Sequence, residues 1–339
     1  MTTSETPDDI PFISFDDYTL YVEYTVGTNL WNYVPPILLV FGTTGNILSI
    51  IVLRRKNLKK SVCTIYFVAL AISDLLVLYT GLLRQWIYMT FDVDIRHIGM
   101  TFCKVHTWIL YFSLDFSAWI QIAVTVERLC VVWFPHAIKY RCTRRAAICS
   151  LSIMACCLLA VNSHILYGIG DDVQDMNGTR TVNQCTYVSK SYKEFFTLSW
   201  PWIYLTVFFL VPFCLLFIGN LLIILKLLLH KRLVNRRVAP VHGTSTTTAQ
   251  PSKLASMSIT LFTLNTVFLV CNIPISIYLI EYENLRATLH GKDYAVLEMV
   301  WAIVNILMYS NNALSFVLYI LSGTRFRREF TRMLCCKKI

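Results

Sequence analysis

Long apolar runs alternate with short polar segments along the whole chain. Seven runs stand out, at about residues 33–53, 63–83, 103–132, 146–167, 197–229, 254–280 and 294–320. A helix needs roughly 20 mostly apolar residues to cross a bilayer, and each run reaches that length. The pattern therefore predicts an all-α membrane protein built as a bundle of seven transmembrane helices.

The last part of the chain follows a different pattern. Residues 323–334 combine a few apolar positions with many basic ones and are too polar to cross a bilayer. Such a segment is typical of a short amphipathic helix on the membrane surface. Three regions result: an extracellular N-terminal segment at 1–32, a seven-transmembrane domain at 33–320, and an amphipathic helix with a cytoplasmic tail at 321–339.

Composition and charge support a membrane protein and give its orientation. The chain is 56% hydrophobic and 15% charged, with a mean hydropathy of +0.56, which does not suit a soluble surface. The net charge of +10 does not indicate nucleic-acid binding, because most of the Lys and Arg residues fall in alternate gaps between apolar runs. The positive-inside rule places those gaps in the cytoplasm and the N-terminus outside the plasma membrane. Residues 1–32 lack the basic start and apolar core of a cleaved signal peptide.

Ionisable residues inside the apolar runs need a reason, since each costs roughly 2.5–3.5 kcal/mol on insertion scales. Asp74 lies in the middle of the second run. Residues at comparable depth in other runs are Asn46, Ser117, Asn311, Asn312 and Ser315. Two interpretations stay open, which are ordinary hydrogen bonding between helices and a site for a monovalent cation.

The third run carries two further unusual features. Glu127 and Arg128 stand at its cytoplasmic end, either as an interfacial anchor or as a latch in which the acid holds the arginine. Asp115 lies deep in the same run, as the floor of a pocket or as a buried hydrogen-bonded residue. In the fifth and sixth runs, Pro212 and Pro274 each remove a backbone hydrogen bond and bend the helix.

Several residues are candidates for covalent modification. Cys103 and Cys185 both fall on the oxidising side of the membrane, which suggests a disulfide. Asn177 begins a glycosylation sequon, and Cys335 and Cys336 follow the amphipathic segment as palmitoylation candidates. The Ser- and Thr-containing stretch at 243–248 is either a phosphate acceptor or a flexible linker.

The order and spacing of several short motifs resemble those of rhodopsin-like (class A) G-protein-coupled receptors over about residues 33–336. Glu127-Arg128-Leu129 is similar to the family's acid–Arg–aromatic motif, and Cys103 precedes Arg128 by the family's 25 residues. The other matching motifs are Gly45-Asn46, Leu70-Ala71-Ile72-Ser73-Asp74, Phe268 with Cys271-Asn272-Ile273-Pro274, and Tyr319 with Phe326. Two departures are Asn272 in place of the usual tryptophan, and Ser315-Phe316 in place of Asn-Pro.

The resemblance implies that an extracellular ligand promotes nucleotide exchange on a heterotrimeric G protein. Arrestin, receptor kinases and membrane lipids are the further expected partners. No cofactor is required, and an allosteric sodium ion is a candidate ligand. The implied sodium site maps onto Asp74, Ser117 and Asn311. The implied coupling and switch residues are Glu127, Arg128, Phe268, Asn272, Pro274 and Tyr319.

The ligand is constrained mainly by exclusion. Leu110 stands where amine receptors of the family carry aspartate, and the seventh run has no lysine to bind retinal. Polar and aromatic residues near the outer ends form either a ligand pocket or the aromatic belt of a membrane interface. The pocket candidates are Arg84, His106, Tyr111, Tyr204, Tyr278, Glu281, Trp301 and Asn305. Among these, Glu281 suits a basic peptide, and Arg84 suits a carboxylate or an amide.

Residues 81–86 and 133–136 resemble the corresponding segments of invertebrate neuropeptide receptors of the FMRFamide type. A neuropeptide is therefore the expected ligand. The alternatives are a receptor of the same fold for a lipid or another small molecule and, less in keeping with the absence of internal repeats, a membrane transporter. A membrane enzyme is disfavoured, because the sequence contains no grouping of nucleophilic or metal-binding residues.

Overall fold

The computed structural model describes residues 17–134, 142–176, 179–237 and 249–335. The glycosylation sequon at Asn177, the cysteine Cys336 and the stretch at 243–248 lie outside these ranges. The proposals attached to them therefore stay predictions.

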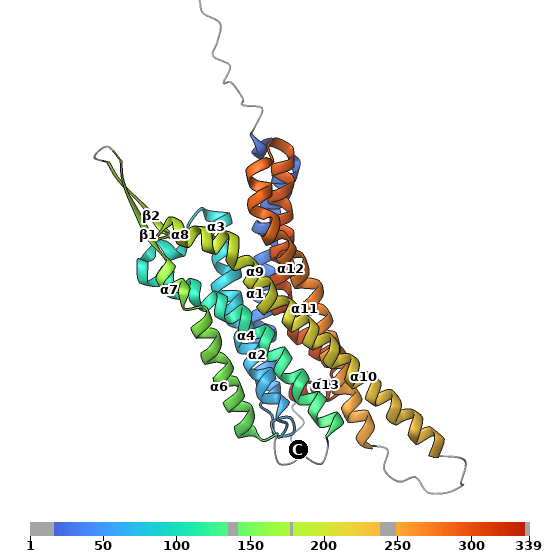
Figure 1. The fold of residues 1–339 in the computed structure, drawn as a ribbon. Helices are drawn as coiled ribbons and strands as arrows, with labels where there is room; N and C mark the ends of the chain where they lie inside the picture. The colour runs from blue at the N-terminus through green and yellow to red at the C-terminus, as the bar shows by residue number, and fades with distance from the viewer. Residues whose placement is uncertain (1–16, 135–141, 177–178, 238–248, 336–339) are drawn as a thin grey trace, which may run out of the picture.

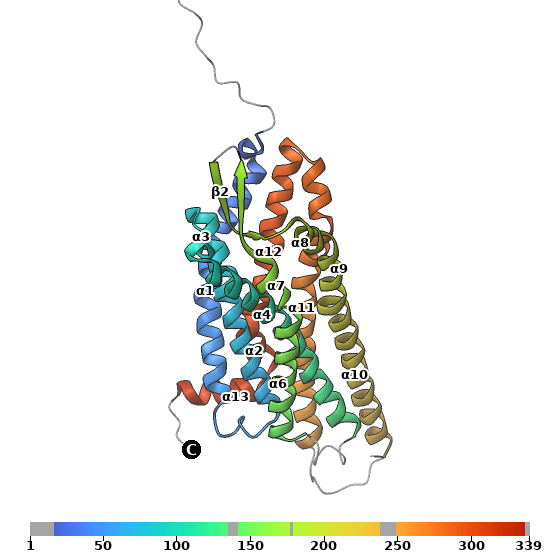
Figure 2. The same ribbon diagram turned by 60° about the vertical axis from the view of Figure 1, so that its left-hand side comes forward.

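Within the described residues, seven helical segments are long and apolar enough to cross a membrane. They lie side by side as an elongated bundle, which confirms the predicted fold class (Figures 1 and 2). The helices of the bundle are α1 (Val22–Leu53), α2 (Cys63–Val77), α3 (Leu83–Phe91), α4 (Met100–Trp133), α6 (Arg144–Val161), α7 (His164–Gly168), α8 (Lys190–Glu194), α9 (Trp200–Tyr204), α10 (Val211–Arg237), α11 (Ala249–Thr288) and α12 (Gly291–Ser322).

Short turns of other helix types join some of these pieces. Three π-helical turns make the second and fifth crossings continuous, and they are η2 (Leu78–Leu82), η4 (Phe195–Ser199) and η5 (Leu205–Leu210). Two 3-10 turns lie outside the crossings, η1 (Tyr18–Leu20) before α1 and η3 (Ile95–Ile98) between α3 and α4.

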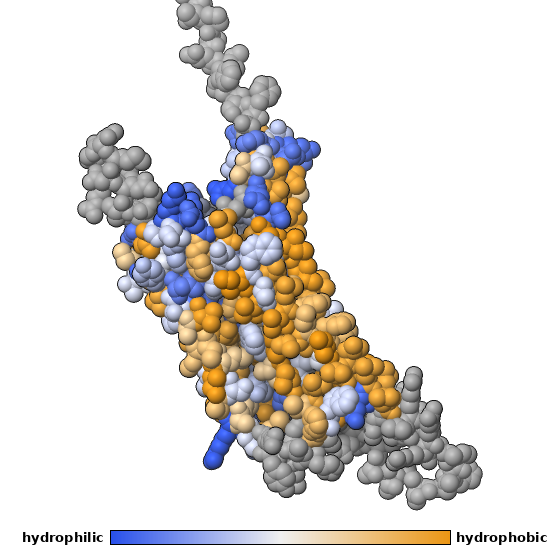
Figure 3. Space-filling view, viewed as in Figure 1, coloured by the Kyte–Doolittle hydropathy of each residue, from blue (hydrophilic) through white to orange (hydrophobic). Residues whose placement is uncertain are grey.

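The sides of the bundle are apolar, as a bilayer requires. Large hydrophobic side chains such as Ile37, Val40, Ile153 and Phe217 are exposed on the outer faces of the helices. Figure 3 shows hydrophobic residues over most of the visible length, with hydrophilic residues gathered toward one end. In water such a surface would aggregate, so these faces are the ones that contact lipid.

The first helix begins at Val22, well before the start predicted near residue 33. Its polar outer turns pack against α12, where Trp31 is buried and a Cβ on Gly27 would come within 3.1 Å of the Met299 Cα. Hydropathy marks only the part of a helix that faces lipid, so it missed these turns. Residues 22–32, assigned by the sequence to the N-terminal segment, are therefore helical.

A β-hairpin covers one end of the bundle and was not expected from the sequence. Strands β1 (Ile169–Met176) and β2 (Thr179–Tyr187) pair antiparallel, with Ile169 opposite Tyr187 at the base. The end of the bundle that carries it is called the hairpin end below (Figure 1).

The predicted amphipathic helix is present as α13 (Thr324–Leu334), which runs across the opposite end, called the α13 end (Figure 2). Its Phe326 and Phe330 rings lie 5.9 and 5.4 Å from the Phe316 ring of α12. Glu329 of α13 is buried, and its carboxylate pairs with Arg332 at 2.9 Å. Burial alone would raise the pKa of Glu329, but hydrogen bonds from Asn57 and Arg332 bring the pKa below its usual value.

Candidate functional site

A cavity of about 320 Å³, called the main cavity, lies between α4, α9, α11 and α12. Pockets for small ligands have volumes of roughly 300–1,000 Å³ and mostly apolar walls. The wall here is rich in aromatic residues, which include Tyr111, Trp200, Tyr204, Phe208, Trp301 and Tyr309. The main cavity can therefore hold an apolar or aromatic group that makes a few polar contacts.

A second space of about 280 Å³, called the vestibule, lies beside the main cavity under the hairpin. The two share five wall residues, which are Arg84, Leu110, Tyr111, Tyr187 and Phe196. The vestibule also contains His106 and Thr107, both buried. Neither the ring nitrogens of His106 nor the Thr107 hydroxyl has a hydrogen-bond partner among the described residues.

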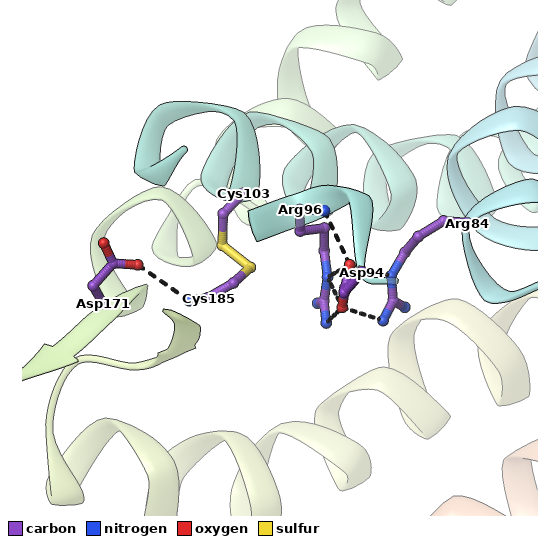
Figure 4. Close-up of a disulfide and its surroundings, with 6 residues drawn as sticks. All are labelled: Arg84, Asp94, Arg96, Cys103, Asp171 and Cys185. Carbon is purple, nitrogen blue, oxygen red and sulfur yellow. Dashed lines mark hydrogen bonds and ion pairs between the residues drawn. A yellow bond between two sulfur atoms is a disulfide. The ribbon is translucent and has the colours of Figure 1, made fainter. Parts of the chain in front are cut away.

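The predicted disulfide joins Cys103 at the start of α4 to Cys185 of β2, with Cα atoms 5.7 Å apart (Figure 4). Cys185 has a left-handed backbone, with φ of 54°, and its amide donates to Asp171 Oδ1 at 3.2 Å. The disulfide fixes the base of the hairpin to α4, and the hydrogen bond ties Cys185 of β2 to Asp171 of β1. Cys185 and its neighbours consequently form part of the vestibule wall.

Two arginines share one acid at the side of the vestibule (Figure 4). Asp94 Oδ2 lies 2.9 Å from Arg84 Nη2 and 2.6 Å from Arg96 Nη2. Burial alone would raise the pKa of Asp94, but hydrogen bonds from Arg96 and Arg84 hold the pKa well below its ordinary value. With the acid ionised, the three side chains carry one net positive charge toward the vestibule.

The structure places the eight predicted pocket residues in different positions. Five line the main cavity, and His106 lines the vestibule. Those five are Arg84, Tyr111, Tyr204, Trp301 and Asn305. Tyr278 lines neither space, because its hydroxyl donates to the Leu297 backbone oxygen at 3.1 Å between α11 and α12. Glu281 is exposed and likewise lies outside both walls.

Asp115 combines the two roles that the sequence left open. It is 1% exposed, and its Oδ2 accepts a hydrogen bond of 2.7 Å from Asn162 Nδ2 at the end of α6. It also forms part of the wall of the main cavity. The sequence contained no signal for Asn162, because an amide at a helix end is common and its neighbour in space is 47 positions away.

Asp74 is held by three side chains midway along the bundle. Its oxygens accept from Ser117 at 3.2 Å, Asn312 at 2.8 Å and Ser315 at 2.7 Å. Asn311, which the resemblance assigned to the sodium site, instead lines the main cavity. Adjacent residues on a helix differ by 100° in direction, and spacing alone did not decide which asparagine faces Asp74.

At the α13 end, Arg128 lies in a buried cluster that includes Glu127 and Cys63. Its Nε is 2.9 Å from Glu127 Oε2 and 2.7 Å from the Sγ of Cys63, at the start of α2. The Cys63 thiol donates to the same Glu127 oxygen at 2.7 Å. Arg128 is only 7% exposed, which fits an arginine held between helices better than one extended to the membrane surface. Cys63 carries no signal of this contact in the sequence, since a cysteine in an apolar run usually only packs.

The other predicted switch residues lie on α11 and α12. Phe268 and Asn272 line the main cavity one turn apart on α11, and Asn272 Nδ2 donates to the Phe268 backbone oxygen at 2.7 Å. Pro274 follows within the same helix. Tyr319 is buried against Phe67, and its hydroxyl has no hydrogen-bond partner in the described part of the chain.

Comparison with known proteins identifies the family of this chain. A family model described as the 7 transmembrane receptor (rhodopsin family) matches residues 45–319. The chain belongs to this family. It is therefore a G-protein-coupled receptor and a multi-pass membrane protein, not an enzyme, and the resemblance seen in the sequence is confirmed.

Relatives of this receptor are similar at moderate identity. The B1 bradykinin receptor of Macaca fascicularis is 25% identical over 296 residues, which is 85% of this chain and 78% of that protein. The FMRFamide receptor of Drosophila melanogaster is 25% identical over 300 residues, 86% of this chain and 51% of that protein. The C-C chemokine receptor type 1 of Homo sapiens is 32% identical over 139 residues, 41% of this chain and 38% of that receptor.

Proposed function

We propose that this receptor binds a neuropeptide at the hairpin end, outside the cell, and activates a heterotrimeric G protein at the α13 end. The charge distribution supports this orientation. Basic residues concentrate at the α13 end, where Arg54, Lys59, Arg327 and Arg328 are exposed. The positive-inside rule puts that end in the cytoplasm.

One observation carries the coupling between the two ends. Ser117 and Asn312 both line the main cavity, and both donate a hydrogen bond to Asp74. A ligand that contacts this wall therefore acts on the side chains that hold the central acid. A ligand shifts the receptor toward signalling only by binding one conformation better than another, and this shared wall provides the differential contact.

A peptide fits the two adjacent spaces better than a compact small molecule. The main cavity takes one or two side chains, and the vestibule extends the site under the hairpin. The net positive charge of Arg84, Asp94 and Arg96 favours a carbonyl or carboxylate acceptor on the ligand there. Two of the relatives are named for bradykinin and FMRFamide, which supports the same class of ligand.

The test is a screen of amidated neuropeptides on cells that express the full chain, with calcium and cyclic-nucleotide readouts. We expect at least one peptide to give a saturable response and to accelerate nucleotide exchange on a G protein in isolated membranes. Arg128→Ala at matched surface expression serves as the control for responses of other receptors. A response to lipids or small organic molecules alone would instead favour the alternative ligand class.

An allosteric sodium ion at Asp74 is part of the proposal. A carboxylate and the hydroxyls of Ser117 and Ser315 are hard oxygen ligands, and the hydroxyls can turn to present their oxygens to a cation. We expect sodium, but not an equal concentration of a large organic cation, to lower agonist affinity. Asp74→Asn should remove that difference, and an unchanged sodium effect in this variant would exclude the site.

A further inference from the structure

We propose that Asp115 binds a cationic group of the ligand at the wall of the main cavity. The proposal deepens the proposed function, on which it rests, by naming the chemistry of the buried part of the ligand: an ammonium or guanidinium group on an apolar stem. It concerns the acid whose role the sequence left open.

The carboxylate of Asp115 is oriented but only half satisfied. Its Oδ2 accepts from Asn162 at 2.7 Å, whereas its Oδ1 has no hydrogen-bond partner among the described residues, although the side chain is 1% exposed. The Asn162 amide is itself anchored, since the same nitrogen donates to the Leu158 backbone oxygen at 3.0 Å. One oxygen is therefore fixed to α6, and the other is buried without a partner among the described residues, on a residue that forms part of the cavity wall.

Asp115 also lacks a cation of its own. None of the ion pairs within the described residues includes it. Arg84 lines the same cavity, but its guanidinium is engaged with Asp94 at 2.9 Å. An ionised carboxylate in an apolar surrounding is strongly unfavourable without a partner, and a ligand cation would provide one.

Aromatic rings complete the surroundings expected of a cation site. Tyr111 and Tyr204 line the cavity with ring centroids 6.1 Å apart, and Phe208 lies 5.3 Å from Tyr204. Aromatic faces attract Lys and Arg groups by cation–π interaction and accept their apolar stems. The carboxylate and the rings together select a cation over a neutral polar group.

The experiment uses the purified full-length receptor and two probes of the same shape. The probes are phenethylguanidinium, which is a cation, and phenethylurea, its neutral isostere. Binding is measured as the concentration dependence of the thermal unfolding midpoint, which requires neither a known peptide nor a G protein. We expect the cation to bind wild type roughly tenfold to a hundredfold more tightly than the urea, the range expected for a charge-assisted contact.

Asp115→Asn should bring the two probes to similar affinity, because the amide keeps the shape and the Asn162 contact but loses the charge. The matched control is Asp293→Asn, which removes an exposed carboxylate from the hairpin end and should keep the preference. Equal binding of both probes to wild type, no binding of the cation, or a preference retained in Asp115→Asn would each overturn the proposal. If Asp115→Asn does not fold, the comparison of the two probes on wild type still decides.

A separate outcome distinguishes this proposal from the proposed function. Loss of the cation preference together with a saturable peptide response would reject the anchor and keep the peptide receptor. A clear preference for the cation without any peptide response would keep the anchor and argue for a small amine or guanidine ligand.

Discussion

Two buried carboxylates on the same helix, Glu127 and Asp115 of α4, have opposite surroundings. Glu127 at the α13 end contacts the Arg128 guanidinium at 2.9 Å and the Cys63 thiol at 2.7 Å. Asp115, three turns nearer the hairpin end, accepts one hydrogen bond and has an oxygen without a partner among the described residues. One site is complete within the chain, and the other is incomplete.

The difference indicates how each site responds to change. Removing one member of a buried ion pair leaves an uncompensated charge and costs about 3–5 kcal/mol, so a complete site resists rearrangement until something replaces the lost partner. An unsatisfied buried polar group costs about 1–3 kcal/mol of stability, and a ligand that supplies the missing hydrogen bond removes this cost. This contrast supports the proposed division of roles, in which the hairpin end accepts a ligand and the α13 end holds a conformation.

The largest expected effect comes from removing the cation of the complete site. Arg128→Ala should reduce agonist-stimulated nucleotide exchange to the level of membranes without receptor, if this guanidinium is the group that the latch hypothesis releases toward the G protein. Ligand binding at the hairpin end should persist, which radioligand or fluorescent-peptide binding on intact cells would measure at matched surface expression. Signalling retained by this variant would mean that the cluster only anchors the helix.

The sequence was sufficient to predict the features that depend on solvent and on spacing along one chain. Seven apolar runs gave the seven crossings, because lipid exposure is a property of each segment. The Cys103–Cys185 disulfide followed from the compartment that both cysteines share. The amphipathic helix α13 followed from a short periodic pattern after the last crossing.

Features that depend on contacts between distant segments could not be predicted in the same way. Asn162, which donates to Asp115, lies 47 positions away along the chain. Cys63, which donates to Glu127, lies 64 positions away. Nothing in their local sequence separates them from ordinary helix-end or core residues. The hairpin was likewise hidden, because its strands pair with one another and carry no long apolar run.

A smaller effect is expected from releasing the β-hairpin at the end of the bundle nearer to Asp115. Replacing Cys103 or Cys185 by Ser releases the hairpin base from α4, and loss of a native disulfide typically costs about 2–5 kcal/mol. Surface delivery or ligand affinity should fall equally in the two variants and no further in the double variant, as measured by surface labelling and saturation binding.

The control for this pair is Cys157→Ser, which alters an exposed free cysteine on α6 and should behave as wild type. Unequal effects of Cys103→Ser and Cys185→Ser would show that one cysteine has a role outside the bridge.

The smallest effect should come from weakening the complete site without removing its cation. Glu127→Gln keeps the shape of the side chain but replaces a charge-assisted contact by a neutral one, a loss of about 1–2 kcal/mol. If the acid restrains Arg128, basal nucleotide exchange should rise by roughly 5- to 30-fold at most, since that energy corresponds to such a shift in a two-state ratio. Glu329→Gln alters another buried acid at the α13 end, which pairs with Arg332, and it should leave basal exchange unchanged. Basal nucleotide exchange that stays at the wild-type level in Glu127→Gln would refute the restraint. The two carboxylates of α4 would then differ in their contacts, but the contacts of Glu127 would have no part in holding the receptor inactive.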